Sequence, residues 1–453
     1  MKSVNPATGN LIQEYKTHSD KEAAHIVDLS HQSFLGWCRE PLAHRAALLR
    51  KAADILRQNR EAYARLMTQE MGKVFRESLA EVDKCAWVCE YYADEGAAHL
   101  ADEPVSTDAS DSFVAYRPLG VVLAVMPWNF PFWQVFRFAA PALMAGNTGL
   151  LKHASNVPGA ALAIESVFRE AGFPENCFRT LMIGSRQVAR VIENPLVMAV
   201  TLTGSTQAGK AVASKAGECL KKSVLELGGS DPYLVLEDAD LDLAANACAT
   251  SRLINAGQSC IAAKRFIVVE SVYEEFIDKF VTQMGNRKMG DPMQEETGIG
   301  PQASETLRDE LHQQVRRSID MGAECILGGE IPDVKGSYYP PTVLSHVEKG
   351  MPAWDEELFG PVAAVIRVKD EHDAIVVAND SVFGLGSAVF TRDEDKGRRI
   401  ARDELFAGCC FVNDFVKSDP RLPFGGVKES GYGRELARFG IREFLNIKTV
   451  YVS

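Results

Sequence analysis

A cysteine that follows a glycine turn is the first residue in this sequence that could do chemistry. In the segment Asn255–Cys260 (NAGQSC), Gly257 allows a flexible turn after a predicted helix and leaves Cys260 at the start of a new segment. A cysteine at the N-terminus of a helix has a lowered pKa and becomes a thiolate nucleophile. The alternative is an inert buried thiol, because most cysteines pack as small hydrophobic residues.

A glutamate enclosed by apolar residues is the second candidate. In Leu225–Gly229 (LELGG), the neighbours of Glu226 are apolar or glycine. Loss of water raises the pKa of a carboxyl group and suits it to activate a water molecule. The alternative is a structural acid in a salt bridge at the end of a strand.

An asparagine held between two prolines is the third candidate. In Met126–Pro131 (MPWNFP), the prolines and Trp128 fix Asn129 directly after a predicted strand. Its side-chain amide can donate a hydrogen bond to a developing oxyanion. A rigid structural turn would use the same residues, so this motif alone leaves both possibilities open.

A glycine-containing turn between a strand and a helix is the fourth candidate. The segment Leu202–Gly209 (LTGSTQAG) follows a predicted strand and opens a helix that runs through Leu220. Backbone N–H groups and the helix dipole can bind a phosphate at such a turn. The segment lacks the G-x-G-x-x-G spacing, so by itself it is weak evidence for a dinucleotide site.

The elements that must position these residues are helices at first, followed by strands and helices in alternation. Ser19 and Glu22 form a capping box, and a periodic helical stretch runs over residues 42–71 and stops at Gly72. The apolar run Val121–Met126 is typical of a strand in a parallel sheet that is covered on both faces. Further elements are expected in alternation: strands over 148–151, 178–183 and 198–202, and a helix over 159–171.

The alternation restarts after Asp231 and indicates a second α/β domain. We expect strands over 233–236 and 265–269 and helices over 241–254 and 273–284. This β-α-β order predicts parallel sheets with helices on their faces, so the fold class is α/β. The tail Thr449–Val452 is a short β segment without a partner nearby in the sequence. It could pair elsewhere in the chain or in another subunit.

Composition excludes several classes of function. The chain has 453 residues, a net charge of −12 and ten cysteines without a C-x-x-C pair. An acidic surface repels nucleic acid, and no apolar run is long enough to cross a membrane. The N-terminus lacks the apolar core of a signal peptide, so we expect a cytoplasmic protein, with no metal site and most thiols buried. The basic pair Arg398-Arg399 lies among acids, as on a solvated helix face.

The order and spacing of these motifs resemble the aldehyde dehydrogenase superfamily over essentially the whole chain. The matching positions are Asn129, Lys152, the Gly204 turn, Glu226, Cys260, Glu357–Pro361, Leu422–Gly426 and Lys428–Glu435. The resemblance implies a Rossmann-like cofactor domain (1–108 and 127–229), a catalytic domain (230–434) and a β oligomerisation element (109–126 and 435–453). It also implies a homodimer or homotetramer in which the C-terminal strand pairs with a neighbouring subunit.

The resemblance also implies a mechanism through a thioester. Cys260 attacks an aldehyde, the Asn129 amide and the Cys260 N–H hold the oxyanion, hydride passes to a nicotinamide, and Glu226 activates the hydrolytic water. The residues then expected around the dinucleotide are Pro127, Trp128, Lys152, Ser155, Gly204, Ser205, Gly209, Leu227, Gly228, Glu357 and Phe359.

The choice of cofactor depends on one position. Family members that select NAD commonly carry a glutamate three residues after the strand-end lysine, bonded to the adenosine ribose. Here that lysine is Lys152, and the place holds Ser155. A serine hydroxyl can donate to a 2′-phosphate and Lys152 adds charge, which favours NADP with NAD accepted. The alternative is that Ser155 tolerates both cofactors. His153 replaces a usual proline and is expected to be a structural variation.

The substrate class depends on Arg137. It lies eight residues past Asn129 on an otherwise apolar helix. The resemblance is nearest to the short bacterial succinate semialdehyde dehydrogenases, in which an arginine here holds the distal carboxylate. The expected substrate-binding residues are Arg137, Trp133, Ser259, Ser418 and Phe424. Ile254 replaces a second arginine that some members have, and a salt bridge between domains is the alternative role of Arg137.

Three other functions remain open. An acylating dehydrogenase would pass its thioester to phosphate or coenzyme A, but it has no use for a hydrolytic base such as Glu226. The aldehyde could be glutarate semialdehyde or an aliphatic aldehyde instead. A catalytically silent structural protein on the same fold would need Cys260, Glu226 or Asn129 to be missing, and all three are present.

Overall fold

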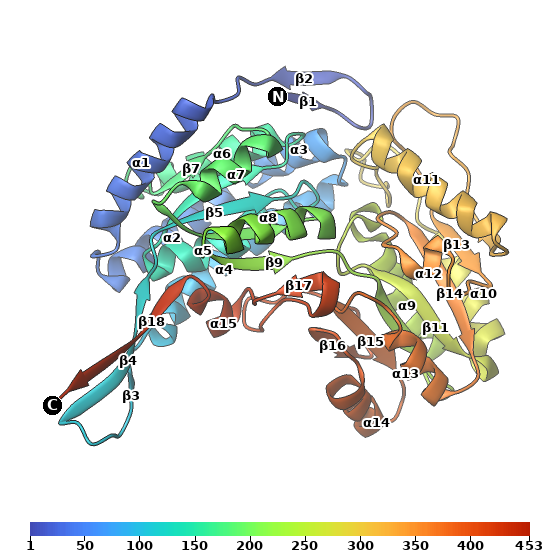
Figure 1. Ribbon diagram of the computed structural model, residues 1–453. Coiled ribbons are helices and arrows are strands. Elements are labelled where there is room, and N and C mark those ends of the chain that lie inside the picture. Colours follow the sequence, from blue (N-terminus) through green and yellow to red (C-terminus); the bar gives the residue numbers. More distant parts are fainter.

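Two mainly parallel sheets, each with helices on both faces, make up the body of the computed structural model of residues 1–453 (Figure 1). A third, antiparallel sheet projects from the body beside the C-terminus. The predicted α/β class, with Rossmann-like parallel sheets, is confirmed.

The first sheet has six strands in the order β17-β9-β8-β5-β6-β7, and only β17 runs antiparallel to its neighbour. Its strands are β5 (Val121–Met126), β6 (Thr148–His153), β7 (Phe178–Thr180), β8 (Val197–Thr203), β9 (Lys222–Glu226) and β17 (Gly431–Tyr432). The strands expected in this region are therefore present, and the strand expected over 178–183 ends at Thr180.

Alternate residues of β5 belong to two different hydrophobic cores, which explains its continuous apolar sequence. Val122 and Ala124 pack with one group of helices, whereas Val121 and Leu123 pack with another. The first group is α2 (Leu42–Gln58), α3 (Arg60–Met71), α4 (Phe75–His99), α5 (Trp133–Ala145), α6 (Pro158–Glu170) and α15 (Ala437–Arg442). The second group is α1 (Asp20–Trp37), α7 (Ser185–Glu193) and α8 (Thr206–Glu218).

Two features of the N-terminal helices test the sequence interpretation. The capping box of Ser19 and Glu22 is confirmed at the start of α1. The single helical stretch expected over 42–71 is wrong, because it breaks into α2 and α3 at Asn59. The Asn59 side chain donates to the carbonyl of Ile55 at 3.1 Å, and its backbone leaves the helical region (φ −104°, ψ 18°).

The second sheet has seven strands in the order β12-β13-β14-β11-β10-β15-β16, and only β12 runs antiparallel. Its strands are β10 (Asp231–Val235), β11 (Ala263–Val269), β12 (Glu324–Leu327), β13 (Thr342–Ser345), β14 (Val362–Val368), β15 (Gly386–Phe390) and β16 (Cys409–Val412). The two strands expected here are confirmed as β10 and β11.

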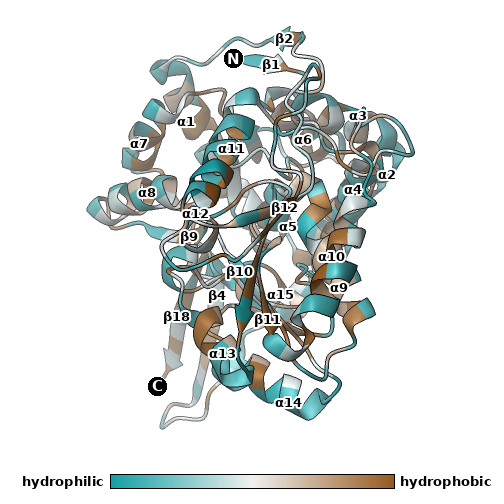
Figure 2. Ribbon diagram, turned by 90° about the vertical axis from the view of Figure 1, so that its right-hand side faces the viewer, coloured by the Kyte–Doolittle hydropathy of each residue, from teal (hydrophilic) through white to brown (hydrophobic).

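The second sheet is also covered on both faces. Tyr233 and Val235 pack into one core, and Leu234 and Leu236 into the other. Helices α9 (Leu241–Leu253) and α10 (Tyr273–Gly285) cover the first face, and α11 (Glu305–Asp320), α12 (Pro352–Asp355) and α13 (Glu371–Asn379) cover the second. Figure 2 shows the strongly hydrophobic strands β10 and β11 between helices that are partly hydrophilic.

The projecting sheet consists of β3 (Glu103–Pro104), β4 (Asp111–Pro118) and β18 (Leu445–Val452), in the order β18-β4-β3. The C-terminal strand therefore finds a partner within the chain, since Leu445 pairs with Pro118 and Val452 with Asp111. The boundaries expected for this element need correction. Strand β5 is central in the six-stranded sheet. Both β17 and α15 also belong with this sheet and its helices, which we call the first unit. They belong neither with the projecting sheet nor with the seven-stranded sheet and its helices, which we call the second unit.

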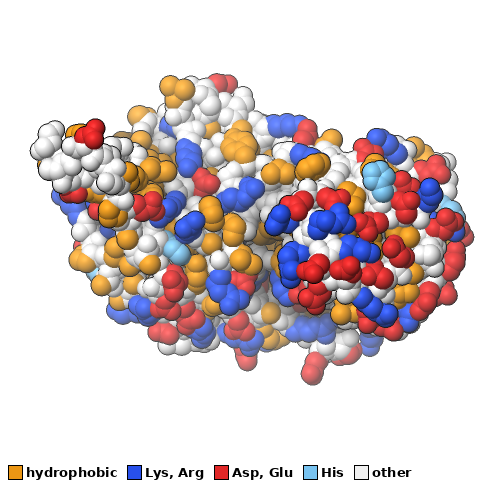
Figure 3. Space-filling model, turned by 90° about the horizontal axis from the view of Figure 1, so that it is seen from below, with side chains coloured by type: hydrophobic (Ala, Val, Ile, Leu, Met, Phe, Trp, Pro, Cys, Tyr) orange, Lys and Arg blue, Asp and Glu red, His pale blue; other side chains and the backbone are white.

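Charged side chains cover the exposed end of the second unit around α14 (Glu394–Arg399), as seen from below (Figure 3). Arg398 pairs with Asp395 at 2.8 Å and Arg399 with Glu371 at 2.7 Å, so the basic pair is solvated among acids as predicted. The remaining strands, β1 (Lys2–Val4) and β2 (Leu11–Glu14), form an N-terminal hairpin. No helix has the length and apolar composition needed to cross a membrane.

Candidate active site

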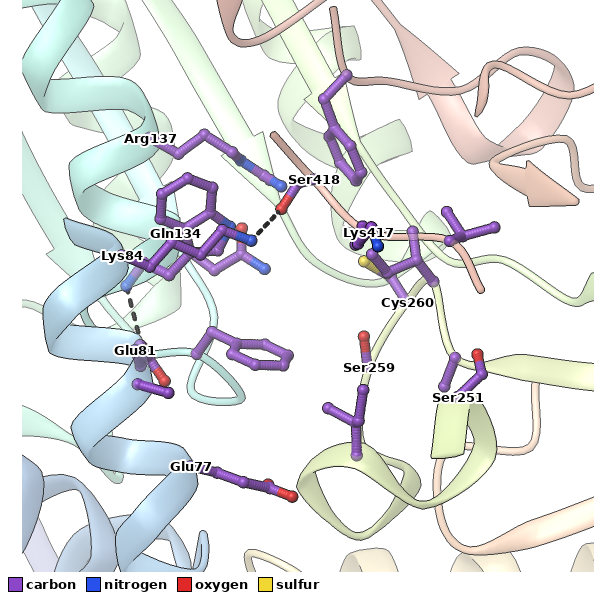
Figure 4. A pocket seen from close by; sticks show the side chains of 18 of the residues that line it. Glu77, Glu81, Lys84, Gln134, Arg137, Ser251, Ser259, Cys260, Lys417 and Ser418 are labelled. Carbon is purple, nitrogen blue, oxygen red and sulfur yellow. Dashed lines mark hydrogen bonds between the residues drawn. The ribbon is translucent and has the colours of Figure 1, made fainter. Parts of the chain in front are cut away.

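A cavity of about 280 Å³ is lined by residues from both units. Helices α4 and α5 of the first unit line it together with the segments 251–262 and 415–424 (Figure 4). Cys260 lines this cavity, and so do all five residues expected to bind substrate: Trp133, Arg137, Ser259, Ser418 and Phe424. The structure thus brings together side chains that are far apart in the sequence.

The turn before Cys260 is held in a strained backbone conformation. Asn255, Ala256 and Gly257 have φ values of 54°, 51° and 75°, which is the left-handed region. Only glycine adopts this region without a steric penalty. At Gly257 a Cβ atom would also collide with the backbone of Gly360. The turn therefore depends on both its glycine and close packing against the Gly360 segment.

The expectation that a helix N-terminus activates Cys260 is wrong. Cys260 follows a short 3-10 helix (Ile254–Gly257) and lies in a turn that leads into β11. Burial raises the pKa of the Cys260 thiol to about 12, although Arg137 and Lys264 act in the opposite direction. The group is thus a thiol at neutral pH, so its proton must leave as the sulfur bonds to a substrate.

Two buried cations that the sequence analysis missed hold the segment that carries Cys260. Arg252 donates from Nη2 to the carbonyl of Gly257 at 2.6 Å. Lys264 donates from Nζ to the carbonyls of Ser259 and Cys260 at 3.0 and 2.7 Å. Both side chains are fully buried. They hold the backbone around the Cys260 thiol, and only the three-dimensional contacts identify this role.

Asn129 lies against the same segment. Its Nδ2 donates to the carbonyl of Gln258 at 3.1 Å, and its own carbonyl accepts from Asn255 Nδ2 at 2.7 Å. The side chain is 4% exposed. The asparagine and the thiol segment are therefore linked by hydrogen bonds, and the oxyanion role of Asn129 stays a prediction.

Glu226 ends β9, and no protein group lies within hydrogen-bond or ion-pair distance of its carboxylate. It is 2% exposed, and neither carboxylate oxygen has a hydrogen-bond partner. Burial raises the pKa of Glu226 well above its usual range, and the carboxyl group of Glu435 raises it further. Gly425 leaves the necessary space, since a Cβ there would lie 2.6 Å from Glu226 Oε1. Glu226 is not the salt-bridged acid of the alternative interpretation.

Arg137 points to the cavity from α5 but has a partner inside the protein. It forms an ion pair with Glu435, and both side chains are almost fully buried. Its guanidinium also lies 4.6 Å from the centre of the Phe424 ring. Arg137 thus has the salt bridge that was the alternative role, while its contact with substrate stays a prediction.

The residues expected around the dinucleotide gather at one edge of the six-stranded sheet. Strand β5 ends before Pro127, β6 ends near Lys152, β8 before Gly204 and β9 before Leu227. Because β5 lies between β6 and β8, this edge is the point where the strand order reverses. Ligands of such sheets bind at the carboxyl ends of the strands at this point.

Lys152 supplies the charge that a phosphate would need at this edge. It is half-buried and forms no ion pair, and burial lowers its pKa. Ser155 follows in an exposed turn, and Ser205 caps α8 by accepting from the N–H of Ala208 at 3.3 Å. Gly209 lies on Leu227 so closely that a Cβ would come within 2.5 Å of its side chain. These residues fit a phosphorylated dinucleotide.

Two aromatic rings and a glutamate join the units beside this edge. The Trp128 and Phe359 rings lie edge to face with centroids 5.7 Å apart. Glu357 accepts from the N–H of Gly229 at 3.0 Å and lies 3.4 Å from Lys264 Nζ. The predicted cofactor residues of the second unit thus contact the first.

His153 has a structural role, as expected. Its Nε2 donates to the carbonyl of Pro131 at 2.9 Å, and its Nδ1 accepts from the N–H of Ala154 at 2.9 Å. Burial lowers the pKa of His153 to about 4, so the ring is neutral and can make both bonds. It ties the turn that carries Asn129 to the end of β6.

Three further polar residues that the sequence analysis missed line the cavity: Glu77, Lys84 and Gln134. Glu77 accepts from the N–H of Asn255 at 2.8 Å, and Lys84 donates to Ser418 Oγ at 2.8 Å. Glu77, Glu81 and Lys84 lie on α4 at the spacing i, i+4, i+7, so three charged side chains share one helix face. This periodic spacing is a signal that the sequence offered. No cluster of three or more metal-ligating side chains is present.

Comparison with known proteins agrees with this geometry. The sequence profile of the aldehyde dehydrogenase family matches residues 1–450. The probable NADP-dependent succinate-semialdehyde dehydrogenase of Synechocystis sp. is 52% identical over 100% of this chain and 99% of its own length. The NADP-dependent succinate-semialdehyde dehydrogenase 1 of Mycobacterium tuberculosis is 48% identical, with 100% and 99% covered.

A solved structure is similar as well. The succinic semialdehyde dehydrogenase of Streptococcus pyogenes, in complex with NADP+, superposes with a TM-score of 0.97 at 38% identity, covering 100% of this chain and 99% of that one. The resemblance inferred from the sequence motifs is confirmed. The chain belongs to the aldehyde dehydrogenase family.

Proposed function

We propose that this protein oxidises succinate semialdehyde to succinate, with NADP preferred to NAD. The observation that carries the proposal is the cavity, which has the Cys260 thiol on one side and the cations Arg137 and Lys84 with Ser418 on another (Figure 4). A short aldehyde with a distal carboxylate suits this distribution of groups. The relatives from Synechocystis sp. and M. tuberculosis bear the same activity in their names.

The first chemical step forms a bond between Cys260 Sγ and the aldehyde carbon, while the thiol passes its proton to solvent. The carbonyl oxygen becomes an oxyanion, which accepts from the Asn129 amide and the Cys260 backbone N–H. Bound NADP supplies the hydride acceptor for the oxidation. The strained turn and the bonds from Lys264 keep the Cys260 backbone in place for this step.

The second step hydrolyses the thioester. Glu226, once it has lost its proton, takes a proton from the water that attacks the acyl carbon, and the Cys260 sulfur leaves. Its burial makes the carboxylate a stronger base than one in water. This base distinguishes the proposed reaction from an acylating dehydrogenase, which must preserve its thioester.

For the cofactor, we assign Lys152 and Ser155 to the 2′-phosphate of NADP. Lys152 has no acid partner within the protein, and Ser155 is exposed beside it. The turn at Gly204 and Ser205 with the N-terminus of α8 would bind the pyrophosphate. Glu357 and Phe359 would contact the nicotinamide half from the second unit.

Subunit assembly belongs to the same proposal. We assign the projecting sheet to a homodimer or homotetramer contact, since β18 is an edge strand with Ile447 65% and Tyr451 55% exposed. Sedimentation of the full chain and of a variant with Ile447 and Tyr451 changed to serine tests this assignment.

Initial rates on an aldehyde panel test the proposed reaction. With NADP, kcat/KM for succinate semialdehyde should exceed that for butanal by about ten- to a hundredfold, because only the former has a carboxylate. Glutarate semialdehyde, one methylene longer, should be used about tenfold less well. A better rate with butanal or glutarate semialdehyde would contradict the substrate, and no turnover of any aldehyde would indicate a silent protein.

A further inference from the structure

Two acids that lie one turn apart on α4 accept hydrogen bonds from two different segments of the site. Glu77 Oε2 accepts from the backbone N–H of Asn255 at 2.8 Å. Glu81 Oε1 accepts from two backbone N–H groups at the start of α5, both at 2.9 Å. The first of these segments leads to Cys260 and the second follows Asn129. One helix is therefore bonded to both segments that must meet at a reacting carbonyl group.

Glu77 accepts from the chain at the point where it leaves the helical path. Helix α9 ends at Leu253, and Asn255 and Ala256 adopt left-handed backbone angles (φ 54° and 51°). Asn255 is 1% exposed, which leaves water little access to its N–H group. A buried N–H group without an acceptor destabilises the conformation that buries it. Glu77 thus supplies an acceptor that the strained turn before Cys260 requires.

Glu81 is held by a cation as well as by the backbone. Its carboxylate pairs with Lys73, and both side chains are buried. The ammonium of Lys73 also lies 3.8 Å from the centre of the Phe130 ring. Glu77 lines the cavity one turn earlier, and Figure 4 shows its side chain reaching from α4 toward the turn that precedes Ser259. Helix α4 therefore holds its own unit through one acid and reaches the second unit through the other.

Direct bonds between the two segments complete this arrangement. Asn129 Nδ2 donates to the carbonyl of Gln258 at 3.1 Å, and Asn255 Nδ2 donates to the carbonyl of Asn129 at 2.7 Å. Each segment is therefore held twice, once by the other segment and once by α4. A small displacement of a nucleophile from an oxyanion donor lowers a rate strongly, because both must act on one carbonyl group.

We propose that Glu77 is a positioning residue: while Glu81 holds the start of α5, Glu77 fixes the turn before Cys260 relative to Asn129. This inference rests on the proposed function for the roles of Cys260 and Asn129, and it applies to any aldehyde that the enzyme oxidises. The turn needs an acceptor oxygen at the right distance from the Asn255 N–H group, and it does not need the negative charge of the side chain.

Three substitutions of Glu77 separate position from charge. Glu77→Gln keeps the length and an acceptor oxygen without the charge, Glu77→Asp keeps the charge but is one methylene shorter, and Glu77→Leu removes the acceptor. We expect kcat for succinate semialdehyde and butanal to fall together, about a hundredfold in Glu77→Leu and about tenfold in Glu77→Asp, and to stay near normal in Glu77→Gln. KM for NADP should change less than about twofold, because none of the residues assigned to the dinucleotide lines this cavity.

Asp83→Asn is the matched control. Asp83 is an exposed acid of the same helix that pairs with Arg60, and its substitution should leave kcat unchanged. The rate of NADPH formation in a single turnover should fall with kcat in Glu77→Asp and Glu77→Leu, which places the loss before product release.

Normal single-turnover rates in Glu77→Asp and Glu77→Leu would overturn the positioning role. A severe loss in Glu77→Gln beside a normal rate in Glu77→Asp would overturn it as well, because charge would then matter and position would not. Thermal unfolding shows whether each variant is folded, and the comparison of Gln with Asp remains decisive if Glu77→Leu is not. No turnover of any aldehyde by the unmutated enzyme would instead contradict the proposed function.

Discussion

At the scale of single residues, burial shifts the pKa of three titratable groups in or near the site. Loss of water raises the pKa of Cys260 and of Glu226 and lowers the pKa of Lys84, because each shift disfavours a charge in the interior. The sequence indicated that Glu226 would be desolvated, since its neighbours are apolar. It did not indicate the same for Cys260, whose surroundings come from distant segments.

Lys84 makes substrate binding depend on pH. Burial, together with Arg137 on α5, lowers its pKa to about 8, although Cys85 and Glu81 on α4 and Asp419 in the loop oppose the shift. The ammonium is present below pH 8 and is lost above it. KM for succinate semialdehyde should therefore rise as the pH passes about 8, while KM for butanal should not follow.

Steady-state kinetics from pH 7 to 9.5 on both aldehydes measure this effect. Lys84→Arg is the control, because a guanidinium stays charged over this range. If KM for both aldehydes changed with pH in the same way in the unmutated enzyme, the Lys84 ammonium would not be binding the substrate carboxylate.

Ser155 determines the second residue-scale prediction. A carboxylate at this place would repel a 2′-phosphate that Lys152 attracts, so Ser155→Glu should raise KM for NADP about tenfold or more and KM for NAD much less. Titration of the protein fluorescence with each cofactor gives the same comparison without turnover. Equal changes for NADP and NAD would remove Ser155 from the adenosine ribose site, and Ser155→Ala serves as the uncharged control.

At the scale of elements, the sequence predicted the strands well because each alternates between two cores. The segment Val121–Met126 is apolar at every position, and so is Tyr233–Leu236. Only a strand in a sheet that is covered on both faces requires such a sequence. The break at Asn59 was not predicted, because a side-chain hydrogen bond within a helical pattern leaves the hydrophobic period unchanged. The ion pair of Arg137 with Glu435 joins segments that no local pattern connects.

The turn before Cys260 is the element whose geometry the chemistry needs most. In Gly257→Ala, the new Cβ would meet the backbone of Gly360 and Pro361, which cannot move away as a flexible side chain would. The turn must shift, and a displacement of about 1 Å can lower a rate about a hundredfold. We expect kcat to fall by that factor while the thermal unfolding transition stays cooperative.

Ala256→Gly is the control in the same turn. It relieves a left-handed alanine (φ 51°) and should stabilise the protein by about 1 kcal/mol, measured by denaturant unfolding. Near-normal kcat in Gly257→Ala would contradict the view that this turn positions the thiol.

At the scale of the whole molecule, the site exists only where the two units meet. Lys84 and Arg137 of the first unit line the same cavity as Cys260 and Ser418 of the second. Motif order in the sequence identified most of these residues through the family resemblance. It could not identify Lys84, whose partner Ser418 lies 334 residues away along the chain. It also misplaced β5, since the projecting sheet and the central strand are adjacent in sequence.

If the aldehyde is oxidised as a covalent acyl group on Cys260, that group should accumulate on the protein when its hydrolysis is blocked. The Glu226→Gln protein is mixed with succinate semialdehyde and NADP, and its mass is determined intact and after digestion, with Cys260→Ala as the control. We expect a succinyl group of about 100 Da on the peptide that contains Cys260, with about one NADPH per site, because hydrolysis lacks its base. Rapid turnover without any adduct on Cys260 would contradict it.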